Sequence, residues 1–300
     1  MLETILAAIS PLNQEAMEKC QLRLDNLSKP LNSLHSFEHL ACKLAGITGN
    51  PRPRSLPKSI LIVNGGAMAD SQATTAVHVF AEHVSAKIVQ VDIHAAVHDL
   101  AIPAMRVRKA VETGIKAVSQ EIHQGAKVIG LGYRGTDSRA AGTMIVDYYS
   151  SNSGRKSAAA DSDVKYHLGL LQNAGNMEIA GLVGVIIGAA AGRAAVVMDG
   201  LATSAAALVA VQMLPGIKEY LVGAHFSVEP VHTTALTIMG VPAYLHLDMP
   251  CGDGSGAALG MSLLNASLHM LNDMKTFGEA EVAVAQDGPG ALRQSKDVKD

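Results

Sequence analysis

The chain has 300 residues, and 48% of them are apolar, which is enough for a substantial core in one large domain or in a domain and a half. Its 24 basic and 27 acidic side chains give a formal net charge of −3, and no basic run is longer than a pair, so we expect no nucleic-acid partner. The uncharged segment between Asp199 and Lys218 is rich in alanine and contains Thr203 and Gln212, so it predicts a buried helix and no membrane span.

Cysteine usage and the N-terminus indicate the compartment. The three cysteines, Cys20, Cys42 and Cys251, are odd in number and far apart, which argues against a disulfide framework or a zinc site and favours a reducing environment. Glu3 stands where an export signal needs positive charge. We therefore expect a cytoplasmic protein.

The two ends of the chain are predicted to be helical. Residues 1–57 contain helical apolar patterns that finish in a proline-rich linker, and a long helix is predicted from Gly256 to about Met274. We expect the far end of this helix to pack against the N-terminal helices. The prediction is a small helical domain made of residues 1–57 with 262–300, and a larger domain at 58–261.

Short apolar runs alternate with helix-length segments after residue 57. Six strands are predicted, at 59–63, 87–91, 127–131, 194–198, 220–223 and 243–247, with helices between them at 71–85, 105–124, 139–150, 177–191 and 202–214. This alternation predicts an α/β fold with a mainly parallel six-stranded sheet and helices on both faces.

Polar residues gather where three of the predicted strands end. Asp199 follows one strand, the cluster from His225 to Glu229 follows the next, and the segment from Cys251 to Gly256 follows the last. Ligands bind outside the carboxyl ends of the strands of an open parallel sheet, so we expect one site. The candidate substrate-binding residues there are Asp199, Gly200, Ser227, Glu229, Gly252, Gly254, Ser255 and Gly256.

Three further candidates for substrate binding, Gly130, Gly132 and Gly135, form a G-x-G-x-x-G pattern between a predicted strand and a helix. Such glycines let backbone N–H groups approach a phosphate. A dinucleotide site is disfavoured because the pattern follows the third strand rather than the first. A phosphate-binding turn and a purely structural turn both stay open.

Asp253 lies in the G-D-G-S-G segment that opens the predicted long helix. The positive helix end could hold an anion, and Asp253 would then be the one nearby side chain able to act as a base. The alternative is that Asp253 only caps the helix. His94 and His98 could share a helix face, but no third ligand accompanies them in the pattern, so we expect no metal.

Four segments of the chain carry a family resemblance, supported by Leu27 to Leu34. They are Val197-Met198-Asp199-Gly200, Ser204-Ala205-Ala206-Ala207-Leu208, His225-Phe226-Ser227-Val228-Glu229 and Gly252-Asp253-Gly254-Ser255-Gly256-Ala257-Ala258-Leu259. Through them, residues 175–274 resemble the nicotinate-nucleotide:dimethylbenzimidazole phosphoribosyltransferases of cobamide lower-ligand synthesis. The resemblance implies a Rossmann-like large domain, a small helical domain, a dimer, and transfer of phosphoribose from nicotinate mononucleotide to an aromatic base without a further cofactor.

The sequence departs from this family where chemistry is expected. The family's catalytic Glu falls on Asp253, one methylene shorter, and a misplacement on the order of 1 Å can cost about a hundredfold in rate. An Arg just upstream falls on Pro250, a Glu of the Gly-rich loop falls on Tyr133, and a phosphate-binding Asn-Thr-Thr falls on Ser138-Arg139-Ala140. The resemblance therefore implies a retained framework with an eroded site.

Our leading interpretation is a subunit that supports a homologous catalytic subunit in a pseudosymmetric heterodimer, with Asp253 vestigial. The chain resembles the more divergent subunit of the two-subunit enzyme that activates phenol and p-cresol. One alternative is a self-sufficient transferase that uses Asp253 as its base. Another is a nucleotide-binding protein without activity. The pattern leaves open whether the acceptor is a benzimidazole, a purine or a phenol.

Overall fold

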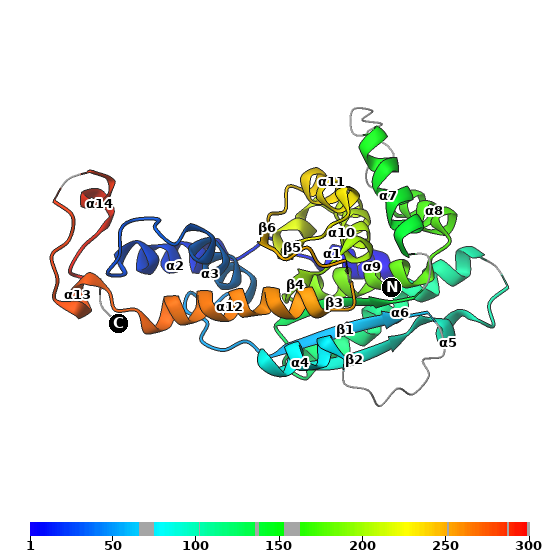
Figure 1. The fold of residues 1–300 in the computed structure, drawn as a ribbon, viewed down its shortest axis with the longest axis horizontal. Coiled ribbons are helices and arrows are strands. Elements are labelled where there is room, and N and C mark those ends of the chain that lie inside the picture. Colours follow the sequence, from blue (N-terminus) through cyan, green and yellow to red (C-terminus); the bar gives the residue numbers. More distant parts are fainter. Residues whose placement is uncertain are drawn as a thin grey trace. The chain divides into compact units, whose positions relative to one another are not determined.

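The computed structural model of the chain describes residues 1–65, 75–101, 103–135, 138–152, 163–250, 252–286 and 288–298. These residues form two compact units (Figure 1). The larger unit comprises Met1–Ser10 and Pro57–Met261, and the smaller unit comprises Pro11–Leu56 and Ser262–Asp300. Within the described ranges, no helix is long and apolar enough to cross a membrane.

The larger unit is built on a six-stranded sheet in which every pair of neighbouring strands is parallel. The strands are β1 (Lys58–Asn64), β2 (Ala86–Asp92), β3 (Val128–Arg134), β4 (Ala195–Met198), β5 (Leu221–Phe226) and β6 (Ala243–His246). Their order in the sheet is β2-β1-β3-β4-β5-β6. The chain thus moves from β1 to one edge and then returns to the other side of β1, which puts a topological switch point between β1 and β3.

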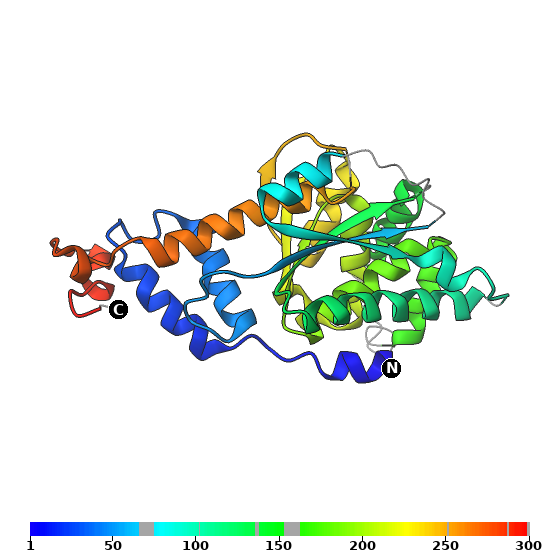
Figure 2. The ribbon, with the colours of Figure 1, turned by 90° about the horizontal axis from the view of Figure 1, so that it is seen from below.

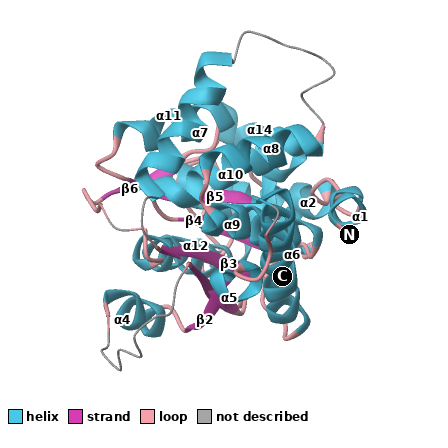
Figure 3. Ribbon diagram, turned by 90° about the vertical axis from the view of Figure 1, so that its right-hand side faces the viewer, coloured by secondary structure: helices cyan, strands magenta, loops and turns pink. Residues whose placement is uncertain are grey.

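Helices cover both faces of this sheet (Figure 3). On one face, Gly181 of α9 lies against Val63 of β1, and on the other face Gly130 of β3 lies against Ala257 and Met261 of α12. Figure 2 shows α4, in cyan, and the start of α12, in orange, on the same face of the sheet. The helical elements of this unit are α1 (Leu2–Ala7), α4 (Ala76–His83), α5 (Ile93–Val97), α6 (Pro103–His123), α7 (Ser138–Asn152), α8 (Val164–Ala174), α9 (Met177–Ala191), α10 (Leu201–Met213), η1 (Pro215–Tyr220), α11 (Pro230–Met239) and the first part of α12 (Ser255–Asp273).

The predicted α/β fold with a mainly parallel six-stranded sheet is confirmed. Two strands continue three residues beyond the prediction: β3, where Gly132 to Arg134 stay paired with β1, and β5, which includes His225 and ends at Phe226. The helix predicted at 71–85 corresponds to α4, while residues 71–74 lie outside the described ranges. Helix α8 was not predicted; Asp163 caps its first turn, and Gly175 ends it in the left-handed conformation.

The smaller unit joins N-terminal and C-terminal helices around one apolar core. It contains α2 (Gln14–Asn26), α3 (His35–Thr48), the later part of α12, α13 (Phe277–Ala280) and α14 (Gly288–Arg293). Arg23 of α2 donates hydrogen bonds to the backbone oxygens of Leu271 and Met274. The buried residues of the core are Cys20, Leu24, Leu27, Ala41, Cys42, Ala45, Met270 and Leu271.

Met1–Ser10 belongs to the larger unit, whereas the sequence pattern groups residues 1–57 in the small domain. Leu2 is 1% exposed, and α1 packs against α9. The Tyr220 hydroxyl donates to the backbone oxygen of Ser10 at 2.7 Å. An amphipathic pattern predicts that a segment is helical but not which core buries its apolar face, and this is why the boundary was misplaced.

Helices α6 and α9 approach so closely that two positions require glycine. A Cβ atom on Gly184 of α9 would overlap the backbone oxygen of Val111, and one on Gly114 of α6 would overlap the backbone oxygen of Gly181. In both cases the obstacle is main chain, which cannot rotate away as a side chain would. The high Ala and Gly content of this region therefore serves close helix packing.

Substitution of Gly184 tests this packing. We expect Gly184→Ala to destabilise the chain by about 1 to 3 kcal/mol, because the added methyl group forces the two helices apart. Gly169 of α8 is the matched control, since an added Cβ there meets no heavy atom within 4 Å. Gly169→Ala should stabilise by about 0.5 to 1 kcal/mol through helix propensity. Urea unfolding measures both values, and equal effects of the two substitutions would contradict a close approach of α6 and α9.

Candidate active site

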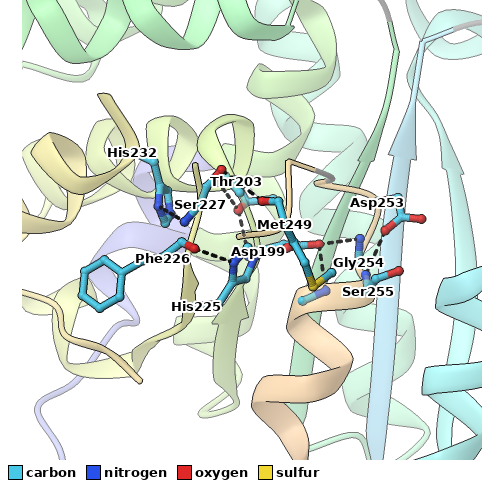
Figure 4. A network of polar contacts seen from close by, with 12 residues as sticks. Asp199, Thr203, His225, Phe226, Ser227, His232, Met249, Asp253, Gly254 and Ser255 are labelled. Carbon is cyan, nitrogen blue, oxygen red and sulfur yellow. Dashed lines mark hydrogen bonds and ion pairs between the residues drawn. The ribbon is translucent and has the colours of Figure 1, made fainter. Parts of the chain in front are cut away.

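A buried ion pair joins the carboxyl ends of β4 and β5 (Figure 4). Oδ1 of Asp199, the residue after β4, lies 2.7 Å from Nε2 of His225 in β5, and both side chains are fully buried. The second ring nitrogen, Nδ1, lies 3.0 Å from the backbone oxygen of Phe226. Because both ring nitrogens face acceptors, both carry a hydrogen, and His225 is an imidazolium beside a carboxylate.

The pKa values of both groups are raised, that of His225 by its partner Asp199 and that of Asp199 by burial. Burial opposes the charged form of His225, but the hydrogen bond and the charge of Asp199 outweigh it and raise the pKa of His225 above its ordinary value. Burial raises the pKa of Asp199, while His225 and the N–H of Gly254 counteract that rise. We assign the ionised form to Asp199 because its two oxygens face three hydrogen-bond donors.

Asp199 also fixes the loop that opens α12. Its Oδ2 accepts the backbone N–H groups of Gly254 at 2.8 Å and Gly256 at 3.3 Å. A Cβ on Gly256 would overlap the Asp199 carboxylate, and Gly254 has φ of +100°, a conformation that favours glycine. Gly256 is therefore required by the approach of the loop to Asp199, and Gly254 by its backbone conformation.

Asp253 caps the same turn. Its Oδ1 accepts the N–H of Ser255 at 3.0 Å, and the side chain is half-buried. The neighbouring Gly252 accepts a hydrogen bond from the backbone N–H of Tyr133 at 2.7 Å, which holds the loop against β3. The capping role, one of the two that the sequence left open, is what the geometry provides. With Asp199 taking two N–H groups and Asp253 a third, the chain's own carboxylates occupy the start of α12.

Ser227 and Glu229 follow β5 and bond to neighbouring segments. The Ser227 hydroxyl donates to the backbone oxygen of Met249 at 3.3 Å. Glu229 precedes α11 and accepts a hydrogen bond from Arg139 of α7 at 2.6 Å. The backbone N–H of Ser227 donates to Nδ1 of His232, so this buried histidine is neutral with its hydrogen on Nε2.

The glycines predicted to form a turn have different surroundings. Gly130 and Gly132 lie inside β3 rather than after it, so the expected turn is wrong for these two residues. A Cβ on Gly132 would come within 2.6 Å of the backbone oxygen of Asp253, so the loop before α12 packs directly on β3 at this position. Gly135 follows the strand and faces Tyr133 and Glu178. Gly200 precedes α10, whose Thr203 hydroxyl donates to the Gly200 backbone oxygen.

The structure thus brings Asp199, Gly254, Ser255 and Gly256 together, but with Asp199 inside the protein. The sequence pattern predicts Asp199 as a substrate-binding residue; its side chain is fully buried and fixes the loop before α12, and contact with a substrate stays a prediction. The sequence pattern includes His225 in the polar cluster that ends at Glu229. It does not predict the pairing of His225 with Asp199, because no spacing rule joins residues from two strands. Glu178 was also missed, although it is the one charged residue in the 15-residue helix α9, which was a usable signal.

Removal of the Asp199 carboxylate should destabilise the larger unit strongly. We expect Asp199→Ala to cost about 3 to 5 kcal/mol, because it leaves the His225 imidazolium buried without a partner. The exposed pair of His269 and Asp273 has the same 2.7 Å separation with side chains 77% and 67% exposed. Asp273→Ala should therefore cost less than about 1 kcal/mol. Chemical denaturation compares the two, and similar small losses would contradict the role of burial.

The pH dependence of stability should report His232. Burial lowers the pKa of His232 to about 4, and the charge of His225 adds to this. Between pH 6.5 and 4 the unfolded chain binds a proton that the folded chain does not, so stability falls as pH falls. Because the pKa of His225 is raised, His225 stays protonated in the folded chain over this window, and its contribution to the free energy of unfolding stays constant.

We therefore expect the free energy of unfolding of the wild-type chain to fall by roughly 2 to 3 kcal/mol more than that of His232→Gln between pH 6.5 and 4.5. The glutamine can still accept the Ser227 N–H through its side-chain oxygen. Urea unfolding at a series of pH values gives the two slopes. Parallel curves would show that His232 is not held neutral.

Comparison with known proteins agrees with this architecture. A sequence profile of a phosphoribosyltransferase family matches residues 9–90 and 152–282. The nicotinate-nucleotide–dimethylbenzimidazole phosphoribosyltransferase of Dehalococcoides mccartyi (strain CBDB1) is 31% identical over 95% of this chain and 99% of its own length. The enzyme of the same name from Roseiflexus sp. (strain RS-1) is 32% identical over 94% and 98%.

Solved structures show the same fold. The crystal structure of nicotinate-nucleotide–dimethylbenzimidazole phosphoribosyltransferase from Thermus thermophilus superposes with a TM-score of 0.75 at 23% identity, and covers 91% of this chain and 99% of that chain. Family profile, relatives and fold agree over most of the sequence. The chain therefore belongs to the family of the nicotinate-nucleotide:dimethylbenzimidazole phosphoribosyltransferases.

Proposed function

We propose that this chain is a cytoplasmic subunit of an α-phosphoribosyltransferase that moves phosphoribose from nicotinate mononucleotide to an aromatic lower-ligand base, a phenol or a benzimidazole, in cobamide synthesis. In this proposal it works beside a homologous subunit that carries the catalytic groups. Family membership and the names of the relatives support the reaction type. The subunit role rests on the state of the site.

The observation that carries the subunit role is the occupation of the α12 start by Asp199 and Asp253. A helix N-terminus binds an anion through free N–H groups and its positive end. Here the N–H groups of Gly254, Ser255 and Gly256 each donate to a carboxylate of the same chain. These N–H groups are therefore already used within the chain, and the carboxylate of Asp253 repels a phosphate.

The region that the family profile leaves unmatched supports the same conclusion. Residues 91–151 lie outside the two matched segments, and they contain β3 with Gly130, Gly132 and Tyr133. The matched segments contain β4, β5 and the loop before α12, which form the framework of the larger unit. A retained framework of this kind is what we expect of a protomer kept for its assembly with a related chain.

A self-sufficient enzyme is the second candidate, because Asp253 is half-buried rather than sealed off and lies at the carboxyl edge of the sheet. Its carboxylate could serve as a base after leaving the Ser255 N–H. A binding protein without turnover is the third.

Activity of the separate and combined chains tests the proposal. This chain, a homologue from the same genome and the co-expressed pair are each assayed for transfer from nicotinate mononucleotide to p-cresol and to dimethylbenzimidazole. We expect the chain alone to be inactive and the pair to exceed the homologue alone. In the pair, Asp253→Ala should keep activity within about twofold, because Asp253 is a cap and not a base.

Three results would count against it. An active homodimer of this chain that gains nothing from the homologue refutes the subunit role. Loss of transfer in the Asp253→Ala pair with unchanged mass and melting temperature establishes the self-sufficient enzyme. Binding of nicotinate mononucleotide with no transfer by any combination indicates the binding protein.

A further inference from the structure

Glu178 lies at the topological switch point of the sheet, where α/β proteins bind their ligands. Gly65 follows β1 and Gly135 follows β3, the two strands that flank this point. A Cβ on Gly65 would overlap the Glu178 carboxylate, and one on Gly135 would lie 3.1 Å from its Oε1. The carboxylate therefore extends from the start of α9 into the space between the ends of the two strands.

Two more polar side chains adjoin this carboxylate. The Tyr133 hydroxyl lies 2.5 Å from the position of a Cβ on Gly135, so it borders the same space. Asn176, which caps α9, donates to the Tyr133 hydroxyl at 3.2 Å. The carboxylate of Glu178, the phenol of Tyr133 and the amide of Asn176 therefore lie close together at the switch point.

Glu178 differs from three other carboxylates at this edge of the sheet. Those of Asp199, Glu229 and Asp253 each accept a hydrogen bond from another residue. Among the described residues, no other side chain hydrogen-bonds to the Glu178 carboxylate, and its own backbone N–H is the donor beside it. Burial raises its pKa, with His94 opposing the rise by its charge. The half-buried Glu178 carboxylate therefore keeps acceptor oxygens that a ligand with a hydrogen-bond donor can use.

We propose that Glu178 recognises the aromatic acceptor by accepting a hydrogen bond from its acidic O–H or N–H group. This inference rests on the proposed function. The charge of the site favours this ligand over the phosphate group, since a carboxylate repels a phosphate and attracts a donor. Ribose hydroxyls of the nucleotide offer the same donor chemistry, so the experiment separates the two substrates.

Ligands with and without the donor group make the test direct. Calorimetry on the full chain compares p-cresol with 4-methylanisole, and benzimidazole with 1-methylbenzimidazole, so that each pair differs by one O–H or N–H. We expect the wild-type chain to bind the donor member roughly tenfold more tightly. Glu178→Ala should remove this preference, while nicotinate mononucleotide binds to both proteins alike.

Two variants serve as controls. Glu178→Gln keeps the shape of the side chain and one acceptor oxygen, so it should show an intermediate preference and a normal melting temperature. Glu219→Gln changes an exposed glutamate in η1, before β5 and thus at the opposite end of that strand, and should bind all ligands as the wild type does.

Equal binding of the paired ligands by the wild-type chain would overturn the inference, as would an unchanged preference in Glu178→Ala. A loss confined to nicotinate mononucleotide would assign Glu178 to the ribose and overturn the acceptor role. A wild-type chain that binds none of these ligands also overturns it. The proposed function stands or falls separately, because the stimulation of the homologue is measured without reference to binding at Glu178.

Discussion

The ion pair between Asp199 and His225 is the interaction on which the arrangement of the larger unit depends. Moving two charges out of water costs several kcal/mol, and the structure offsets this with a short contact and further hydrogen bonds on both groups. The bonds connect β4, β5 and the start of α12. Because Asp199 accepts the N–H groups of Gly254 and Gly256, the ion pair also dictates the course of the loop between β6 and α12.

Close packing of small residues is the second constraint, and it acts together with the first. Gly256 leaves room for Asp199 and His225, while Gly130 and Gly132 let α12 and its preceding loop rest on β3. The loop can reach Asp199 only because the strand beneath it has no side chains at these points. Gly130 and Gly132, which match a phosphate-binding pattern, thus face α12 and the loop before it. The close packing at these glycines leaves no room there for a ligand.

The carboxyl edge of the sheet accordingly has two different regions. Near β4 and β5 the charged groups are paired: Asp199 and His225 are fully buried, whereas Glu229 is paired with the exposed Arg139. Between β1 and β3 the Glu178 carboxylate lies half-buried at the switch point with Tyr133 and Asn176 beside it. The second region is therefore the part of this edge where we propose that a ligand binds.

The sequence by itself determined the layered α/β fold, because alternating apolar runs and the polar residues after them follow from local periodicity. It also placed Asp199, Ser227 and the 252–256 segment at one edge of a parallel sheet. Only the tertiary structure decided that Asp199 pairs with His225, that Gly130 and Gly132 continue β3, and that residues 1–10 join the larger unit. The reason is physical: such pairings join residues distant in sequence, and their partners are set by how helices and strands pack, which no local spacing records.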